Sequence, residues 1–241
     1  MVKIIIKLGT KAVFDAVKGE IKRSVLLSLV RSVSELLNRG DEVIIVSSGA
    51  VGCGKKIICK DDGIGLKQAQ AAVGQIKLME EYISAFGTKG LHIAQFLLNV
   101  DDLNSKRLKN IKEAYRHLGS DVIPIVNEND VTATGELSFG DNDNLAMELL
   151  LKLDFDVLLI FTERGVLVKE GEPVLFSNDF SVENYDNLSD DDGYGFGGLK
   201  SKLLVAKKVV ESGKNFFIGN VNDNVLDILE GKAMATRFAK V

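Results

Sequence analysis

Residues 122–153 read VIPIVNENDVTATGELSFGDNDNLAMELLLKL, which is an apolar run, a polar loop and a second apolar run. The first run, residues 122–126, is typical of a buried strand, and the second, residues 145–153, has the spacing of a helix. The loop between them, residues 127–144, holds four asparagines and five acids and has neither lysine nor arginine. Because open α/β sheets bind ligands at the carboxyl ends of their strands, we expect this loop to form part of a binding site. A solvated surface loop would have the same composition, so other parts of the chain must decide between a binding site and a surface loop.

Apolar runs and helical patterns alternate along the whole chain. Apolar runs of strand length occur at residues 3–8, 42–46, 91–99, 122–126, 156–161, 166–168, 173–176, 215–218 and 235–239. Helical spacing of apolar residues occurs at residues 21–37, 66–86, 105–118, 144–153, 199–212 and 222–229. Strands that are apolar throughout and separated by helices indicate a mainly parallel sheet with helices on both faces. We therefore predict an α/β fold, a three-layer αβα sandwich that forms one domain over residues 1–241.

The composition is that of an ordinary globular protein and argues against several classes of function. The 241 residues carry a net charge of −4, whereas a nucleic-acid-binding surface normally carries a basic stripe. No apolar run approaches the ~20 residues needed to span a bilayer. Cys53 and Cys59 have no histidine near them in the sequence, so we interpret them as free thiols of a cytoplasmic protein. We predict no metal site, no nucleic-acid partner and no membrane association.

Two glycine-rich motifs resemble nucleotide-binding sequences without matching their context. Residues 49–56, GAVGCGKK, follow a predicted strand, but Lys56 stands where a phosphate-binding loop needs a Ser or Thr hydroxyl for Mg²⁺. Residues 193–198, GYGFGG, follow an acidic loop, whereas a dinucleotide fingerprint follows a strand. Both motifs, like the turn at Gly9, contain glycine, which lets backbone N–H groups approach an anion closely. These three glycine turns are therefore candidate anion-binding segments.

Lysines stand at positions where an anion is needed to stabilise them. Lys7 interrupts an apolar strand just before Gly9, and burying an ammonium group without an anion is costly. An acid of the protein itself could supply that anion, and this alternative stays open. Lys200 and Lys202 open a predicted helix, where the helix dipole and an ammonium group together favour phosphate. With the Asn/Asp loop, the set predicts a phosphoryl-transfer site in which lysines neutralise the transferred group and acids orient the lysines and Mg²⁺.

Five short motifs occur in the order and spacing of one protein family. They are KLGT at residues 7–10, SSGA at 47–50, NEND at 127–130, GDNDN at 140–144 and GGLKSK at 197–202. On these motifs the chain resembles the amino acid kinase family over nearly its whole length, and NEND with GDNDN resembles the branch that phosphorylates glutamate. The resemblance implies the amino acid kinase fold and ATP-dependent phosphorylation of the γ-carboxylate of L-glutamate, the first step of proline biosynthesis.

The resemblance also implies roles for individual residues. Lys7 and Lys202 would contact the ATP phosphates as catalytic residues, and Asp143 would hold both lysines in place. The acceptor glutamate would be bound by Ser48, Gly49, Ala50, Asn127, Asp130 and Asn142, with Asp130 receiving the α-ammonium group. The nucleotide would be bound by Lys7, Gly9, Thr162, Glu163, Phe196, Gly197, Gly198, Leu199, Lys200, Ser201 and Lys202. The γ-carboxylate is ionised at pH 7 and needs no general base, so charge neutralisation and positioning carry the chemistry.

The resemblance further implies a cytoplasmic homo-oligomer whose partners are L-glutamate, ATP and Mg²⁺ carried with ATP, with proline as a candidate feedback inhibitor. The chain departs from the family on the nucleotide side, where Glu163 replaces the usual Asp and FGGL at residues 196–199 replaces TGGM. Many relatives also carry a C-terminal PUA domain, which we do not expect within residues 1–241.

Two alternative functions are compatible with the same fold. The first is another small-acid kinase, acting on N-acetylglutamate, carbamate or uridylate. Asp130 argues against N-acetylglutamate as the acceptor, because an acid placed to bind a free α-ammonium group would find no such cation on an acetylated acceptor. The second is a non-catalytic sensor that binds an amino acid or nucleotide. A sensor would be expected to lose a phosphate-binding lysine or Asp143, and the sequence keeps Lys7, Lys202 and Asp143.

Overall fold

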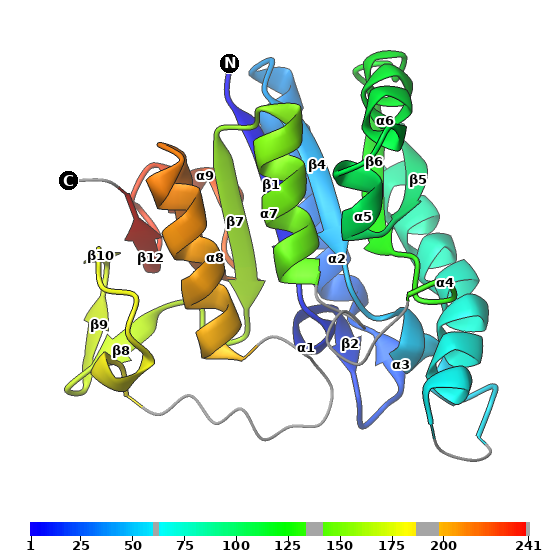
Figure 1. Cartoon of the computed structure of the whole chain (residues 1–241), viewed down its shortest axis with the longest axis horizontal. Helices are drawn as coiled ribbons and strands as arrows, with labels where there is room; N and C mark the ends of the chain where they lie inside the picture. Colours follow the sequence, from blue (N-terminus) through cyan, green and yellow to red (C-terminus); the bar gives the residue numbers. More distant parts are fainter. Residues whose placement is uncertain (60–62, 134–141, 187–197, 240–241) are drawn as a thin grey trace.

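A central sheet organises the chain, whose computed structural model describes residues 1–59, 63–133, 142–186 and 198–239 (Figure 1). The described residues form an eight-stranded sheet with the order β10-β12-β11-β7-β1-β4-β6-β5. Its strands are β1 (Lys3–Leu8), β4 (Glu42–Ser47), β5 (His92–Leu98), β6 (Val122–Glu128), β7 (Val157–Thr162), β10 (Phe176–Ser177), β11 (Asn215–Asn220) and β12 (Ala235–Phe238). The six strands from β11 to β5 are parallel to one another, whereas β12 is antiparallel to β11. The predicted mainly parallel sheet is therefore confirmed.

Helices cover both faces of the sheet because its central strands are apolar on both sides. Successive side chains of a strand point to opposite faces, and in β1 the fully buried Ile4 and Ile6 belong to one core cluster while Ile5 belongs to the other. The first cluster packs against α2 (Arg23–Asn38), α4 (Ile64–Gly87) and α9 (Val225–Leu229). The second packs against α6 (Arg107–Arg116), α7 (Asn142–Leu153) and α8 (Leu199–Glu211), of which α7 and α8 lie in front of the sheet in Figure 1. This is the predicted three-layer αβα sandwich.

Every predicted helix and strand is present, with ends shifted by a few residues, but several short elements were not predicted. These are α1 (Thr10–Val13), β2 (Phe14–Asp15), β3 (Glu20–Ile21), α3 (Ala50–Lys55), α5 (Val100–Leu103) and the 3₁₀ turn η1 (Val182–Asn184). They are too short to show a hydrophobic period. The predicted strand at 173–176 is divided: β9 (Glu172–Val174) forms a hairpin with β8 (Leu167–Lys169), and β10 joins the main sheet.

Three further observations bear on the predictions made from composition. Cys53 and Cys59 are both free thiols, and burial raises the pKa of Cys53 to about 11. Among the described residues, no helix has the length and apolar character needed to cross a membrane. The same residues contain no group of three His, Cys, Asp or Glu side chains that could hold a metal ion.

Candidate active site

The predicted site residues gather at the carboxyl ends of the parallel strands, which form the lower edge of the sheet in Figure 1. Lys7 lies near the end of β1, Ser48 directly follows β4, Asn127 lies at the end of β6 and Thr162 ends β7. Parallel strands end at a common edge, so these residues become neighbours although they are far apart in the sequence. The amino ends of α7 and α8 complete the edge. Of the stretch expected to be a polar loop, residues 127–128 belong to β6 and residues 142–144 to α7, and residues 134–141 lie outside the described part of the chain.

A buried carboxylate holds two lysines together at this edge. Asp143, in the first turn of α7, is 1% exposed and forms ion pairs with Lys7 of β1 and with Lys202 of α8. The distance from Lys202 Nζ to Asp143 Oδ2 is 3.2 Å. Burial alone would raise the pKa of Asp143, but the two ammonium groups outweigh it and hold the pKa below its ordinary value. One ionised acid and two ammonium groups leave a net positive charge, which favours an anion such as phosphate at this point.

Glycine backbone and a helix end lie beside the two lysines. A Cβ atom added at Gly9 would lie 3.5 Å from Lys7 Nζ, so the glycine backbone closely approaches this ammonium group. Lys202 is the fourth residue of α8, whose first turn offers unpaired backbone N–H groups and the positive end of a helix dipole. Leu199 packs its side chain into the core, so only its backbone can face a ligand. Phe196 and Gly197 lie outside the described residues.

The near-match to a phosphate-binding loop does not fold as one. Gly49 has φ of +115°, a left-handed conformation that favours glycine, and α3 begins at the very next residue, Ala50. A phosphate-binding loop would need several residues between strand and helix to wrap an anion. Gly49 therefore serves a tight strand-to-helix turn that brings Ser48 and Ala50 to the edge of the sheet.

Three buried polar side chains from three different elements form one hydrogen-bonded group. The amide nitrogen of Asn142 donates to Ser48 Oγ at 2.8 Å and to Asn127 Oδ1 at 2.9 Å. The backbone N–H of Glu128 donates to both Asn127 Oδ1 and Asn142 Oδ1, at 2.9 and 3.1 Å. These contacts fix the orientation of both amides. They also use both N–H groups of Asn142 and leave the hydroxyl hydrogen of Ser48 available to another acceptor.

Asp130 stands two residues after the end of β6 and is a buried carboxylate without a counter-charge among the described residues. It is 8% exposed, and within the described parts of the chain no hydrogen bond or ion pair reaches its side chain. Burial raises its pKa to about 6. An unpaired buried carboxylate with a raised pKa is typical of a functional site, because a ligand cation would relieve its cost.

Gln75 of α4 completes the hydrogen-bonded group and was missed by reasoning from the sequence. Its Oε1 accepts from Asn127 Nδ2 at 2.8 Å. The orientation of the Asn127 amide is fixed because its Oδ1 accepts from the N–H of Glu128, which leaves Nδ2 to face Gln75. Nε2 of Gln75 is therefore left as a donor, and this buried nitrogen has no partner among the described residues. Gln75 itself is 7% exposed.

A sequence signal for Gln75 does exist in the spacing of polar residues along α4. Gln68, Gln75 and Tyr82 stand seven residues apart, which places them on one face of the helix. Gln68 donates to the carbonyl of Ala133 at 3.4 Å, and the fully buried Tyr82 donates to Ser47 Oγ at 2.9 Å. This face of α4 thus supports the segments that carry the acceptor-side residues.

The predicted nucleotide-side residues Thr162 and Glu163 lie where β7 ends. Thr162 Oγ1 accepts from the N–H of Gly165 at 2.9 Å, which closes the turn after the strand. Glu163, the departure from the family pattern, forms an ion pair of 2.5 Å with Lys22, and Lys22 also donates to the carbonyl of Lys11. The longer side chain of Glu163 therefore ties the end of β7 to the segment that follows β1.

Comparison with known proteins settles the family. Residues 2–220 match the amino acid kinase family. The chain belongs to this family.

Among its curated relatives, glutamate 5-kinase of Dictyoglomus thermophilum is 33% identical over 252 residues, covering 99% of this chain and 68% of the relative. Glutamate 5-kinase of Shouchella clausii is 35% identical, covering 97% and 66%. This chain thus spans about two thirds of the length of these family members.

Solved structures agree with the amino acid kinase fold. Carbamate kinase of Giardia has a TM-score of 0.70 at 17% identity, with 99% of both chains covered. UMP kinase from Ureaplasma parvum has a TM-score of 0.62 at 14% identity, with 100% of both chains covered. At such identities these two structures support the fold alone. Their names correspond to two of the alternative functions considered above, carbamate kinase and uridylate kinase.

Proposed function

We propose that this chain transfers the γ-phosphoryl group of ATP to the γ-carboxylate of L-glutamate, producing L-glutamyl 5-phosphate and ADP. An oxygen of the γ-carboxylate forms the new bond to phosphorus while the bond to the β,γ-bridging oxygen of ATP breaks, and ADP leaves with that oxygen. The observation that carries the proposal is that a cationic centre, Lys7–Asp143–Lys202, and Asp130, an acid without a partner among the described residues, lie at the same edge of the sheet. The relatives named glutamate 5-kinase support it.

The cationic centre would serve the transferred phosphoryl group. Phosphoryl transfer needs little covalent help from a protein, and catalysis consists mainly of positioning and charge stabilisation. Lys7 and Lys202 would neutralise the equatorial oxygens of the γ-phosphate, and Asp143 would keep both ammonium groups at fixed positions. The backbone at Gly9 and the first turn of α8 would hold the remaining phosphate oxygens.

Mg²⁺ would enter with the nucleotide rather than bind to a separate protein site. The carboxylate of Asp143 is already engaged by two lysines, and the described residues contain no cluster of three metal-ligating side chains. The phosphates of ATP would supply the ligands, and the ion would offset their charge during transfer.

The acceptor side would recognise both charged groups on the α-carbon of glutamate. Asp130 would pair with the α-ammonium group, and the lone pair of Asn142 Oδ1 that does not accept from the N–H of Glu128 would be a second acceptor for it. The hydroxyl of Ser48 and Nε2 of Gln75, which has no partner among the described residues, would donate to carboxylate oxygens of the substrate. Asn127 would act mainly by orienting Gln75 and Asn142, and backbone groups at Gly49 and Ala50 would complete the pocket.

Asp130 also separates this proposal from the alternative kinases of the same fold. N-acetylglutamate carries an amide in place of the α-ammonium group, so Asp130 would face a group that cannot neutralise it. Such a mismatch leaves a buried charge unpaired, which typically costs at least ~2 kcal/mol. We also infer that residues 1–241 form one amino acid kinase domain, because the main sheet takes strands from β1 through β12. Proline feedback, homo-oligomer formation and a cytoplasmic location stay predictions.

Release of ADP, measured in a coupled assay with L-glutamate and with N-acetylglutamate as acceptors, tests the proposal. We expect turnover with L-glutamate and at least about thirtyfold lower kcat/KM with the acetylated acceptor, since ~1.4 kcal/mol corresponds to tenfold. Turnover of the acetylated acceptor alone would refute the proposed role of Asp130. Lack of turnover with any acid, combined with tight nucleotide binding, would favour the sensor alternative.

A further inference from the structure

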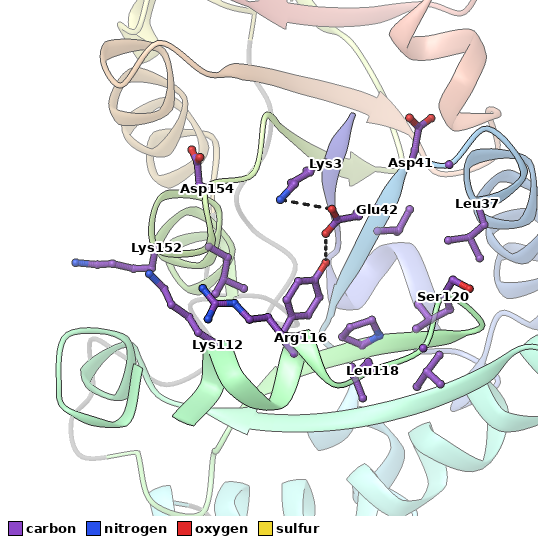
Figure 2. Close-up of a pocket in the computed structure, with 18 residues that line it drawn as sticks. Lys3, Leu37, Asp41, Glu42, Lys112, Arg116, Leu118, Ser120, Lys152 and Asp154 are labelled. Atoms are coloured by element: carbon purple, nitrogen blue, oxygen red, sulfur yellow. Dashed lines mark hydrogen bonds and ion pairs between the residues drawn. The ribbon is translucent and has the colours of Figure 1, made fainter. Parts of the chain in front are cut away.

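A cavity of about 600 Å³ lies at the amino ends of the strands, at the opposite edge of the sheet from the candidate active site (Figure 2). It is lined by the first residues of β1, β4 and β6, which are Lys3, Glu42 and Val122, and by the ends of α6 and α7. Glu42 and Ser47 are the two ends of β4 and lie ~17 Å apart along an extended strand. A ligand in this cavity would therefore not overlap the substrates of the active site.

The cavity exists because β4 and β6 separate at their amino ends. Their ladder contains only the pairs Ile45–Ile125 and Val46–Val126 and does not reach Glu42 and Val43. Pro124 of β6 lines the cavity and has no N–H group to continue a ladder. Where two strands separate, backbone polar groups that face the gap need partners from solvent or from a ligand.

The acids that line the cavity are already neutralised by the protein. Glu42 is paired with Lys3 at 3.4 Å, marked by a dashed line in Figure 2, and accepts from the hydroxyl of Tyr115 at 2.7 Å. Asp154 is paired with Lys214 at 2.6 Å. Asp41 accepts from the backbone N–H of Val2 at 2.8 Å and lies 3.5 Å from Arg39.

Three cations at the same cavity form no ion pair at contact distance among the described residues, although Lys112 lies close enough to Asp154 to lower the pKa of that carboxyl. Lys112 and Arg116 of α6 and Lys152 of α7 form no ion pair with any described residue, and Lys112 and Lys152 are half-buried. Figure 2 shows the three residues on the same side of the cavity, with the side chain of Lys152 extending away from Glu42. Lys112 and Arg116 are four residues apart on one helix, where like charges repel. The carboxyl ends of α6 and α7 offset part of the charge of Arg116 and Lys152, but Lys112 lies a full turn from its helix end.

The remaining wall is mostly apolar and includes Leu118, Pro124, Leu153 and the ring of Tyr115. We propose that this cavity binds a small organic anion, a phosphate or carboxylate group on a compact apolar body, at a site separate from the active site. The cations bind the anionic group and the apolar wall contacts the body. The volume lies within the ~300–1,000 Å³ of typical small-molecule sites.

Calorimetric titration with phenyl phosphate and with benzoate tests the proposal, because the two probes share an apolar body and differ in the anionic group. The titration uses the full chain saturated with a non-hydrolysable ATP analogue and L-glutamate, so that phosphate sites of the active site are filled. Inorganic phosphate serves as a probe without the apolar body. We expect at least one aromatic anion to bind, and to bind more tightly than inorganic phosphate.

Variants identify where the probe binds. Lys112→Met with Lys152→Met keeps the aliphatic stems and removes two charges, and should weaken binding at least about tenfold. Lys89→Met with Lys208→Met removes two exposed lysines outside the cavity lining and should leave affinity unchanged. Arg116→Met alone, at an exposed position, provides a variant that should keep the fold and weaken binding by a smaller factor. Absence of binding by both aromatic anions, or equal affinity in the two double variants, would overturn the proposal.

Discussion

The ammonium nitrogen of Lys202 lies 3.2 Å from Oδ2 of Asp143, a contact that joins the first turn of α8 to the first turn of α7. The other carboxylate oxygen of Asp143 is paired with Lys7 of β1. Three segments that are distant in sequence thus meet through one buried acid. This arrangement holds two positive charges at fixed positions around one acid, and fixed positive charges are what stabilises a transferred phosphoryl group.

Removing the charge of Lys202 should impair catalysis far more than folding. We expect Lys202→Met to lower kcat by about 10²–10³, the usual effect of losing one group that stabilises transition-state charge. The free energy of unfolding should change little, because Lys7 continues to neutralise Asp143. Steady-state kinetics and chemical denaturation measure the two effects. Lys208→Met, an exposed lysine on the same helix, is the matched control, and a near-normal kcat for Lys202→Met would remove Lys202 from its proposed role.

Removing the charge of Asp143 should impair both catalysis and stability. Asp143→Asn leaves two ammonium groups without their shared anion, and breaking such a buried pair typically costs ~3–5 kcal/mol. The pKa of Asp143 is lowered in the folded protein, so its stabilising effect is present above the ordinary carboxyl pKa and is lost as the pH falls. Unfolding free energies measured from pH 7 downward should therefore converge for wild type and Asp143→Asn in acid. A constant difference across this range would contradict the ion-pair account.

Asp130 should affect substrate binding and stability in opposite directions. Asp130→Asn should raise KM for glutamate by about 10- to 100-fold with a smaller effect on kcat, since the lost contact is to the non-reacting ammonium group. The same change should raise the melting temperature at neutral pH, because it removes a buried carboxylate without a partner among the described residues.

The raised pKa of Asp130 gives a further test through pH. Since the carboxylate titrates at about 6 in the free protein, kcat/KM for glutamate should fall as the pH decreases through 6, and Asp130→Asn should flatten this step. An unchanged KM in the variant, or the same pH step, would count against ammonium recognition by Asp130.

Gln75 should contribute to glutamate binding through its unpaired amide nitrogen. Gln75→Glu keeps an acceptor for Asn127 Nδ2, removes the donor and places a negative charge at this buried position, so it both loses the proposed contact and repels a substrate carboxylate. We expect KM for glutamate to rise by at least about tenfold while KM for ATP, the internal control, stays unchanged. Equal increases in both constants would indicate a general structural effect.

Reasoning from the sequence predicted the sheet, and it predicted that the candidate site residues at strand ends lie along one edge of it, for a clear physical reason. Lys7, Ser48, Asn127 and Thr162 lie at strand ends, and parallel strands bring such ends together whatever the details of packing. Gln75 was missed because helical spacing identifies a face of α4 but does not say which element covers it. The cavity at the opposite edge depends on where the ladder between β4 and β6 stops, and a strand pattern does not contain that information.

Trapping the product with hydroxylamine tests the central claim most directly. An acyl phosphate reacts with hydroxylamine to give a hydroxamate, so the chain is incubated with ATP, Mg²⁺, L-glutamate and hydroxylamine, and ADP and hydroxamate are both quantified. We predict γ-glutamyl hydroxamate in equal amount to ADP, and neither product above background for Lys202→Met. Formation of ADP without hydroxamate, or hydroxamate only when N-acetylglutamate replaces glutamate, would contradict transfer to the γ-carboxylate of L-glutamate.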